Sequence, residues 1–115
     1  MFLNSKTMQV LESGVSAAWQ QQQLHLQNMS NVSTPGYKAK SMVFEEVMDG
    51  IKPTGIVTTK VVEDETISTR PDGNNVDSDK ESMELYKAYV QYTMLLNKVS
   101  GEMGKYTTVL NMNMQ

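Results

Sequence analysis

The 115-residue sequence contains no cysteine, which excludes disulfide bonds, a thiolate nucleophile and any metal site built on cysteine. It has a single histidine, His25, with no acidic residue three or four positions away. This argues against a catalytic base or a metal ligand, and we expect an exposed histidine or one that sets helix register. There is also no phosphate-binding glycine loop, no serine elbow and no zinc-binding spacing. We therefore predict a protein that is not an enzyme and that has no cofactor.

Long apolar runs are absent as well. No run approaches the roughly 18 residues of a membrane span, and the N-terminus lacks the basic and apolar regions of a Sec signal peptide. Residues 41–84 hold eleven acidic against four basic residues, whereas the two ends are slightly basic. This pattern differs from the basic footprint of nucleic-acid-binding proteins. We expect no transmembrane segment, no nucleic-acid partner and no small-molecule substrate.

Phenylalanine and tryptophan are few, with two Phe and one Trp against ten Met. Methionine fills irregular gaps and suits adaptable contact surfaces more than a sharply specified core. The length fits one folding unit. A compact globule of this composition would be marginal, so we predict an elongated chain that buries apolar surface against copies of itself.

Residues 1–33 are predicted to form an N-terminal helix. Apolar residues recur there at alternating steps of three and four, which is the spacing of a coiled-coil seam. Two polar residues, Gln22 and His25, interrupt this pattern. Polar residues within a seam weaken it but can fix the register or the number of partners.

Residues 78–115 are predicted to form a C-terminal helix. Ser78 and Glu81 match a capping box, although Asp77 could act as the cap instead. At about 1.5 Å per residue the helix would reach roughly 50 Å, too long for the core of a small globule. We therefore predict a mainly α fold in which the two terminal helices pair as an antiparallel coiled coil and dock onto other subunits. The predicted inter-helix seam consists of Leu85, Tyr89, Tyr92, Leu96, Val99, Met103, Tyr106 and Leu110.

The middle segment, residues 34–77, begins and ends with a turn. Residues 34–37 favour a type II turn, because Pro35 sets φ for its second position and Gly36 allows positive φ at its third. Asn28 and Asn31 can bond the last carbonyls of the first helix or the chain that leaves it. Residues 71–74 form a second predicted turn. The predicted turn motif consists of Asn28, Asn31, Thr34, Pro35, Gly36 and Tyr37.

Between the turns the pattern predicts a short helix over residues 41–48 and a loop over 50–55. The β-branched run 56–62 predicts a strand, which residues 67–70 could join through a turn at 63–65. A ribbon of two strands is marginal alone and needs a helix or another neighbour to pack on.

The run QNMSNVSTPGY over residues 27–37 resembles the N-terminal signature of the bacterial flagellar axial proteins, the family of rod and hook proteins. Gln27 replaces the first asparagine of that signature, and Ser30 replaces its alanine. The run RPDGNNVD over residues 70–77, with the start of the last helix, resembles the C-terminal signature of the proximal-rod members. Ala88 stands where these usually have asparagine, and Tyr89 where glutamine is common.

The resemblance implies a structural role in the rod of the flagellar basal body, in the periplasmic space. Rod subunits stack their terminal helices into a helical tube around the export channel and transmit motor torque. They leave the cytoplasm through the type III apparatus without a cleaved signal peptide. The implied partners are copies of the chain, other rod proteins, the ring-to-rod adaptor and the export-gate proteins. Two alternatives stay open: another rod protein of this family, or a generic helical oligomerisation or adaptor module.

Overall fold

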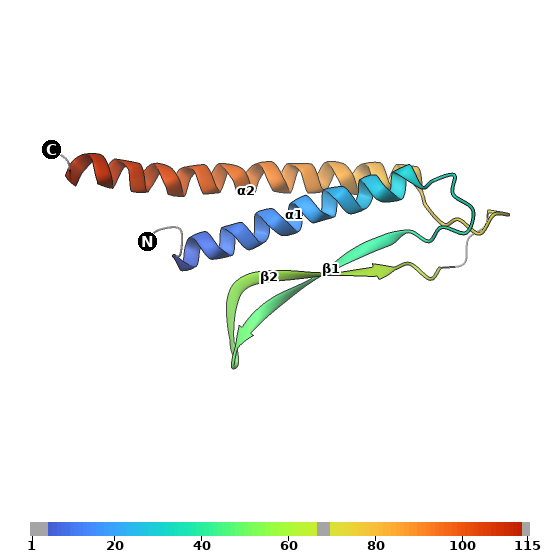
Figure 1. The fold of residues 1–115 in the computed structure, drawn as a ribbon, viewed down its shortest axis with the longest axis horizontal. Coiled ribbons are helices and arrows are strands. Elements are labelled where there is room, and N and C mark those ends of the chain that lie inside the picture. The colour runs from blue at the N-terminus through green and yellow to red at the C-terminus, as the bar shows by residue number, and fades with distance from the viewer. Residues whose placement is uncertain (1–4, 67–69, 114–115) are drawn as a thin grey trace.

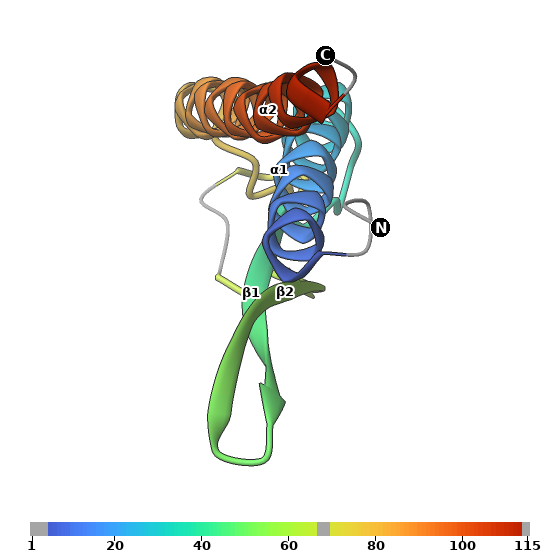
Figure 2. The ribbon, with the colours of Figure 1, turned by 90° about the vertical axis from the view of Figure 1, so that its left-hand side faces the viewer.

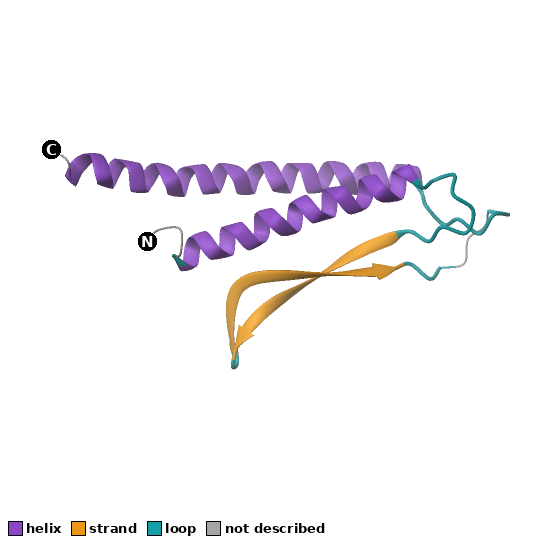
Figure 3. Cartoon of the chain, viewed as in Figure 1, coloured by secondary structure: helices purple, strands orange, loops and turns teal. Residues whose placement is uncertain are grey.

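The computed structural model describes residues 5–66 and 70–113. The element order is α1 (Lys6–Ser30), β1 (Lys40–Asp49), β2 (Lys52–Glu63) and α2 (Ser78–Asn113). Figures 1 and 3 show two long helices lying along each other, with a two-stranded ribbon beneath the first. The prediction of a mainly α fold with a partly β middle is confirmed.

Both helices begin at a side-chain cap. The Ser5 side chain accepts a hydrogen bond from the Met8 N–H, which satisfies one of the unpaired donors of the first turn of α1. At the start of α2, Asp77 Oδ1 accepts hydrogen bonds from the N–H groups of Asp79 and Lys80. Asp77 is therefore the cap, and the alternative capping box with Ser78 is wrong.

The helices run antiparallel, because a contact that lies further along α1 falls at an earlier position in α2. Leu95 packs against Gly14, and the rings of Trp19 and Tyr92 lie 5.8 Å apart between centroids. With 36 residues against 25, α2 is much the longer helix. Its C-terminal end consequently extends beyond the start of α1 (Figure 1).

The buried positions of α2 differ from the predicted seam. Its fully buried residues are Glu81 and Ala88, and Leu95, seven residues further on, is the one that meets Gly14. Glu81, Ala88 and Leu95 thus recur every seven residues on the side of α2 that faces α1. None of these three residues lies in the predicted seam. The antiparallel arrangement is thus present, whereas a coiled coil along the predicted seam is not confirmed.

The middle segment forms a hairpin in which β1 and β2 are antiparallel, with Lys40 opposite Glu63 and Asp49 opposite Lys52. Gly50, with φ of 64°, occupies the first central position of the two-residue turn, where positive φ is required. The short helix predicted at residues 41–48 is wrong, because these residues form a strand. The loop or turn expected over residues 50–55 is confined to a turn at residues 50–51, since β2 begins at Lys52.

The strand predicted at residues 56–62 is confirmed as part of β2. Its predicted partner was residues 67–70, but β2 pairs with β1. Residues 67–69 lie outside the described residues. The β-branched residues of β2 thus pair with the strand that precedes them in the sequence and not with the segment that follows.

The ribbon packs on α1, as a marginal two-stranded sheet requires. The Val57 N–H donates a hydrogen bond to Ser13 Oγ over 3.1 Å, and Thr59 Oγ1 donates to Gln20 Oε1 over 2.6 Å. Figure 2 shows the free end of the ribbon projecting away from both helices. The chain measures 70 × 32 × 15 Å with a radius of gyration of 18.9 Å, against about 13 Å for a compact domain of this length.

Candidate functional site

The first predicted turn has the geometry that its sequence favours. The Tyr37 N–H donates to the carbonyl of Thr34 over 3.2 Å, and Gly36 has φ of 73°. The second turn closes through a 3.1 Å bond from the Gly73 N–H to the carbonyl of Arg70. The first turn is confirmed at residues 34–37, and the second is confirmed one residue before the predicted span, at 70–73.

The two turns touch each other and form one corner, although nearly 40 residues separate them. The Gly36 N–H donates to the carbonyl of Asp72 over 2.7 Å. Lys38 Nζ donates to the carbonyl of Gly73 over 2.7 Å, and the Asn75 N–H donates to the carbonyl of Tyr37 over 3.3 Å. The two sequence signatures are therefore two halves of a single structural unit, which we call the corner.

Asn28 ties the end of α1 to the start of β1. It is completely buried. Its Nδ2 donates to the carbonyl of Lys40 over 2.7 Å, and its Oδ1 accepts from the Lys40 N–H over 3.0 Å and from the Tyr37 hydroxyl over 3.1 Å. Burial raises the pKa of Tyr37, with smaller contributions from the nearby carboxylates of Glu81 and Glu63.

Asn31 caps the end of α1. Its half-buried side chain donates to the carbonyl of Gln27 over 2.8 Å and accepts from Thr34 Oγ1 over 3.0 Å. Together, the two asparagines carry out both predicted functions: Asn31 bonds a last helical carbonyl, and Asn28 bonds the departing chain. Pro35 lies exposed in the turn that follows Asn31.

Asn74 joins the two halves of the corner, and the sequence reasoning did not single it out. It is completely buried. Its Nδ2 donates to the carbonyls of Asn31 and Thr34, each over 2.8 Å, and its Oδ1 accepts from the Val76 N–H over 2.8 Å. The available signal was the pair of consecutive asparagines in the second signature.

Asn75 contributes a further bridge. Its Oδ1 accepts from the Ala39 N–H over 2.6 Å, and its Nδ2 donates to the carbonyl of Asp64 over 2.8 Å. The side chain therefore holds the incoming segment of β1 and the outgoing segment of β2 against the second turn. Three asparagine amides thus fix the path of the chain through the corner.

A buried polar pair lies beside the corner, between the helices. His25 Nδ1 and Glu81 Oε2 are 2.6 Å apart, and both side chains are almost fully buried. At this distance the two atoms are hydrogen-bonded. The expectation of an exposed histidine is wrong. A contact between the helices is consistent with the alternative, that His25 sets their register.

The predicted seam residues divide into two sets. The members Leu85, Tyr92, Val99 and Tyr106 are half-buried, and the members Tyr89, Leu96, Met103 and Leu110 are exposed. Each set repeats every seven residues, so one follows the edge of α2 nearer α1 and the other follows the open surface. The predicted pattern therefore belongs to α2 as a whole and not to the contact with α1 alone.

An apolar surface, which we call the aromatic face, follows one side of the helix pair. Two shallow grooves of about 450 and 410 Å3 run along it. Its main residues are Val15, Trp19 and Leu26 from α1 and Tyr89, Tyr92 and Leu96 from α2. Trp19 and Tyr89 keep 49% and 57% of their surface exposed, which is high for such large apolar side chains. The arrangement can bind another helix, but it contains no catalytic chemistry.

Over residues 5–66 and 70–113, no group of three or more His, Asp or Glu residues is placed to hold a metal ion. None of the helices in these two ranges is long and apolar enough to cross a membrane.

Comparison with known proteins identifies the family. No family model matches the chain. It is similar to the flagellar basal body rod protein FlgB of Bacillus subtilis (strain 168), with 32% identity over 125 aligned positions, covering 96% of this chain and 97% of the relative. The chain belongs to the FlgB family. The match extends over almost the whole of both proteins, so it includes the ribbon as well as the two signatures. The family is one of rod proteins of the bacterial flagellum, which are structural components of the motility apparatus.

Proposed function

We propose that this protein is a structural subunit of the proximal rod of the flagellar basal body. The observation that carries the proposal is the aromatic face, which remains open along a helix pair in an elongated molecule 70 Å long. A monomer rarely exposes a continuous apolar surface of this kind unless it binds a partner. Membership of a rod-protein family explains what that partner would be: further subunits stacked side by side.

In the proposed assembly, the helix pair forms the wall of a helical tube around the export channel. The exposed set of seam residues on α2 would pack on helices of neighbouring subunits, extending the pair into coiled-coil contacts. Torque passes between subunits through such side-by-side packing. Within each subunit, the buried His25–Glu81 contact (2.6 Å) resists sliding of α1 along α2.

The corner has a geometric role in this proposal. It turns the chain from the tube wall toward the ribbon, and its asparagine bonds fix the angle between them. The turn motif predicted from the sequence is therefore proposed as an assembly determinant and not as a binding site for a ligand.

The proposed location is the rod in the periplasmic space, which the protein reaches through the flagellar type III apparatus without cleavage of a signal peptide. The proposed partners are copies of the chain, other rod proteins, the ring-to-rod adaptor and the export-gate proteins. A generic oligomerisation module would share the helix pair but would have no reason to accompany basal bodies.

The proposal predicts that deletion of the gene in the bacterium that encodes it abolishes swimming and leaves basal bodies without a complete rod. Swimming is measured on soft agar, and basal bodies are imaged by electron microscopy after purification. Complementation with the intact gene is the control. Normal swimming and intact basal bodies in the deletion strain would contradict the proposed function.

A second prediction concerns the corner. Gly36→Val places a β-branched residue at φ of 73°, a backbone conformation that costs L-residues about 1–2 kcal/mol. A Cβ at Gly36 would meet no atom within 4 Å, so the strain is confined to the backbone. We expect reduced swimming with little change in the far-ultraviolet circular dichroism of the purified chain.

The matched control is Gly36→Asn, because asparagine tolerates positive φ better than other non-glycine residues. We expect this variant to swim nearly as well as the wild type. If the valine variant builds normal rods, the corner does not set the assembly geometry.

A further inference from the structure

The free end of the ribbon carries an exposed apolar side chain. Ile51 lies in the two-residue turn between β1 and β2 with 93% of its surface exposed, and Met48 beside it is half exposed. Asp49 adds an acidic group at the same end. We call these residues the ribbon tip. An almost fully exposed isoleucine at the end of a projecting hairpin gains nothing for the fold of its own chain.

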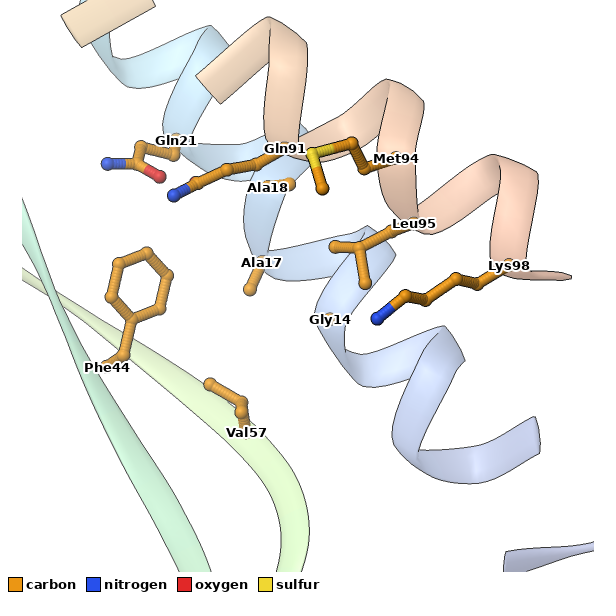
Figure 4. Close-up of a pocket in the computed structure, with 10 residues that line it drawn as sticks. All are labelled: Gly14, Ala17, Ala18, Gln21, Phe44, Val57, Gln91, Met94, Leu95 and Lys98. Atoms are coloured by element: carbon orange, nitrogen blue, oxygen red, sulfur yellow. The ribbon is translucent and has the colours of Figure 1, made fainter. Parts of the chain in front are cut away.

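A second apolar surface of the chain is concave. A cleft of about 380 Å3 lies between the helix pair and the base of the ribbon. Ala17 and Ala18 of α1 line one wall, Met94 and Leu95 of α2 the next, and Phe44 of the ribbon faces them across the opening (Figure 4). The lining is largely apolar and is built on helices and strands, so it is fixed before anything enters.

Two polar features of the cleft match the ribbon tip. Lys98 lies at one end of the cleft (Figure 4), and it can pair with the acidic Asp49. The amide oxygen of Gln21, another lining residue, is buried without a hydrogen-bond partner among the described residues. A buried acceptor of this kind requires a donor, and the backbone N–H groups of a turn are such donors.

The tip and the cleft of one chain cannot meet. The base of the ribbon forms one wall of the cleft, and the tip projects away from the helices (Figure 2). The occupant must therefore come from outside the chain. A tip and a cleft on every copy give a head-to-tail contact, which propagates as an open helical array when its rotation does not close a ring.

We propose that the ribbon tip of one subunit inserts into the cleft of the next copy, with Ile51 against the apolar walls and Asp49 beside Lys98. This inference rests on the proposed function, because it requires copies to assemble. It adds a directional contact through the ribbon to the packing of the helices. The ribbon then links successive subunits around the outside of the tube wall.

Engineered cysteines test the contact, since the natural chain has none. The full chain carrying Ile51→Cys and Met94→Cys replaces the natural protein in its bacterium, and isolated basal bodies are oxidised. We expect disulfide-linked multimers on a non-reducing gel. The matched control carries Ile51→Cys and Met83→Cys; Met83 is also a methionine on α2, with 62% exposure against 57% for Met94, but it does not line the cleft. We expect at least a tenfold lower yield of multimers from the control.

The outcomes separate the two proposals. Multimers absent from basal bodies that contain the variant, or equal in both variants, would overturn the tip-to-cleft contact and leave the proposed function standing. Absence of the wild-type chain from basal bodies would overturn the proposed function itself.

A second measurement tests the same contact without cysteines, in case a cysteine variant fails to assemble. Ile51→Asp puts a charge into the apolar cleft, whereas Ile51→Leu conserves the apolar volume. We expect the aspartate variant to lose swimming and the leucine variant to keep it. The two purified chains should have equal unfolding midpoints, because the Ile51 side chain is 93% exposed in its own subunit. Normal swimming of the aspartate variant would overturn the inference.

Discussion

Glu81→Ala is expected to lower the free energy of unfolding of the purified chain by about 3–5 kcal/mol, the cost of removing one partner of a buried pair. The substitution leaves the His25 ring between the helices without its hydrogen-bond partner. In the wild-type chain, Glu81 Oε2 lies 2.6 Å from His25 Nδ1. Such a loss is a large fraction of the 5–15 kcal/mol that typically separates folded from unfolded states. Urea denaturation followed by circular dichroism measures it.

Two comparisons make this result specific. Glu84→Ala removes a carboxylate one turn further along α2 whose partner, Lys87, is exposed at 3.5 Å, and surface pairs of this kind contribute less than about 1 kcal/mol. The double variant His25→Leu with Glu81→Leu replaces the whole pair by apolar side chains, which should recover most of the lost stability. A loss for Glu81→Ala no larger than that for Glu84→Ala would show that the pair does not hold the helices together.

Elements with a local cause were predictable from the sequence. The helices follow from periodicity over many residues, so small interruptions such as Gln22 do not hide them. The turn at Gly36 follows from two adjacent residues: Pro35 has a fixed negative φ, and Gly36 can adopt the positive φ that the next position requires. Both kinds of signal are complete within a few residues, and the structure confirms them.

The first strand of the ribbon could not be read in the same way. Phe44, Val47 and Met48 fall on one face of a helix as well as they fit a strand, and Glu45 and Glu46 are poor strand formers. Their strand conformation depends on pairing with β2 and on the contact between β2 and α1. Since neither face of the ribbon is deeply buried, no alternation of apolar and polar residues marks it.

The candidate site was predictable only in part for a related reason. The seam pattern of α2 was detected, but a stripe in one sequence does not say which part meets α1 and which part stays open. The partners His25 and Glu81 are 56 residues apart, and Asn74 bonds residues 40 or more positions before it. Contacts at such separations are set by the fold and leave no spacing rule in the sequence.

Asn74→Ala is expected to destabilise the corner by about 3 kcal/mol, because each buried group left without a partner costs about 1–3 kcal/mol. The substitution removes the donor to the carbonyls of Asn31 and Thr34 and the acceptor of the Val76 N–H. Water can reach some of these groups once the side chain is gone, which keeps the total below the sum of the separate costs. Hydrogen exchange of the corner amides and urea denaturation measure the change.

The matched control is Asn31→Ala, which removes the same side chain from a half-buried position in the same corner. Asn31 bonds a carbonyl that water can solvate, so its loss should cost less than about 1 kcal/mol. The contrast matters because the two variants lie on opposite halves of the corner. If Asn74 fastens the second signature to the first, Asn74→Ala should raise hydrogen exchange at both turns, whereas Asn31→Ala should affect only the end of α1. Equal effects of the two substitutions would mean that the remaining contacts, such as those from Gly36 to Asp72 and from Lys38 to Gly73, hold the halves together without Asn74.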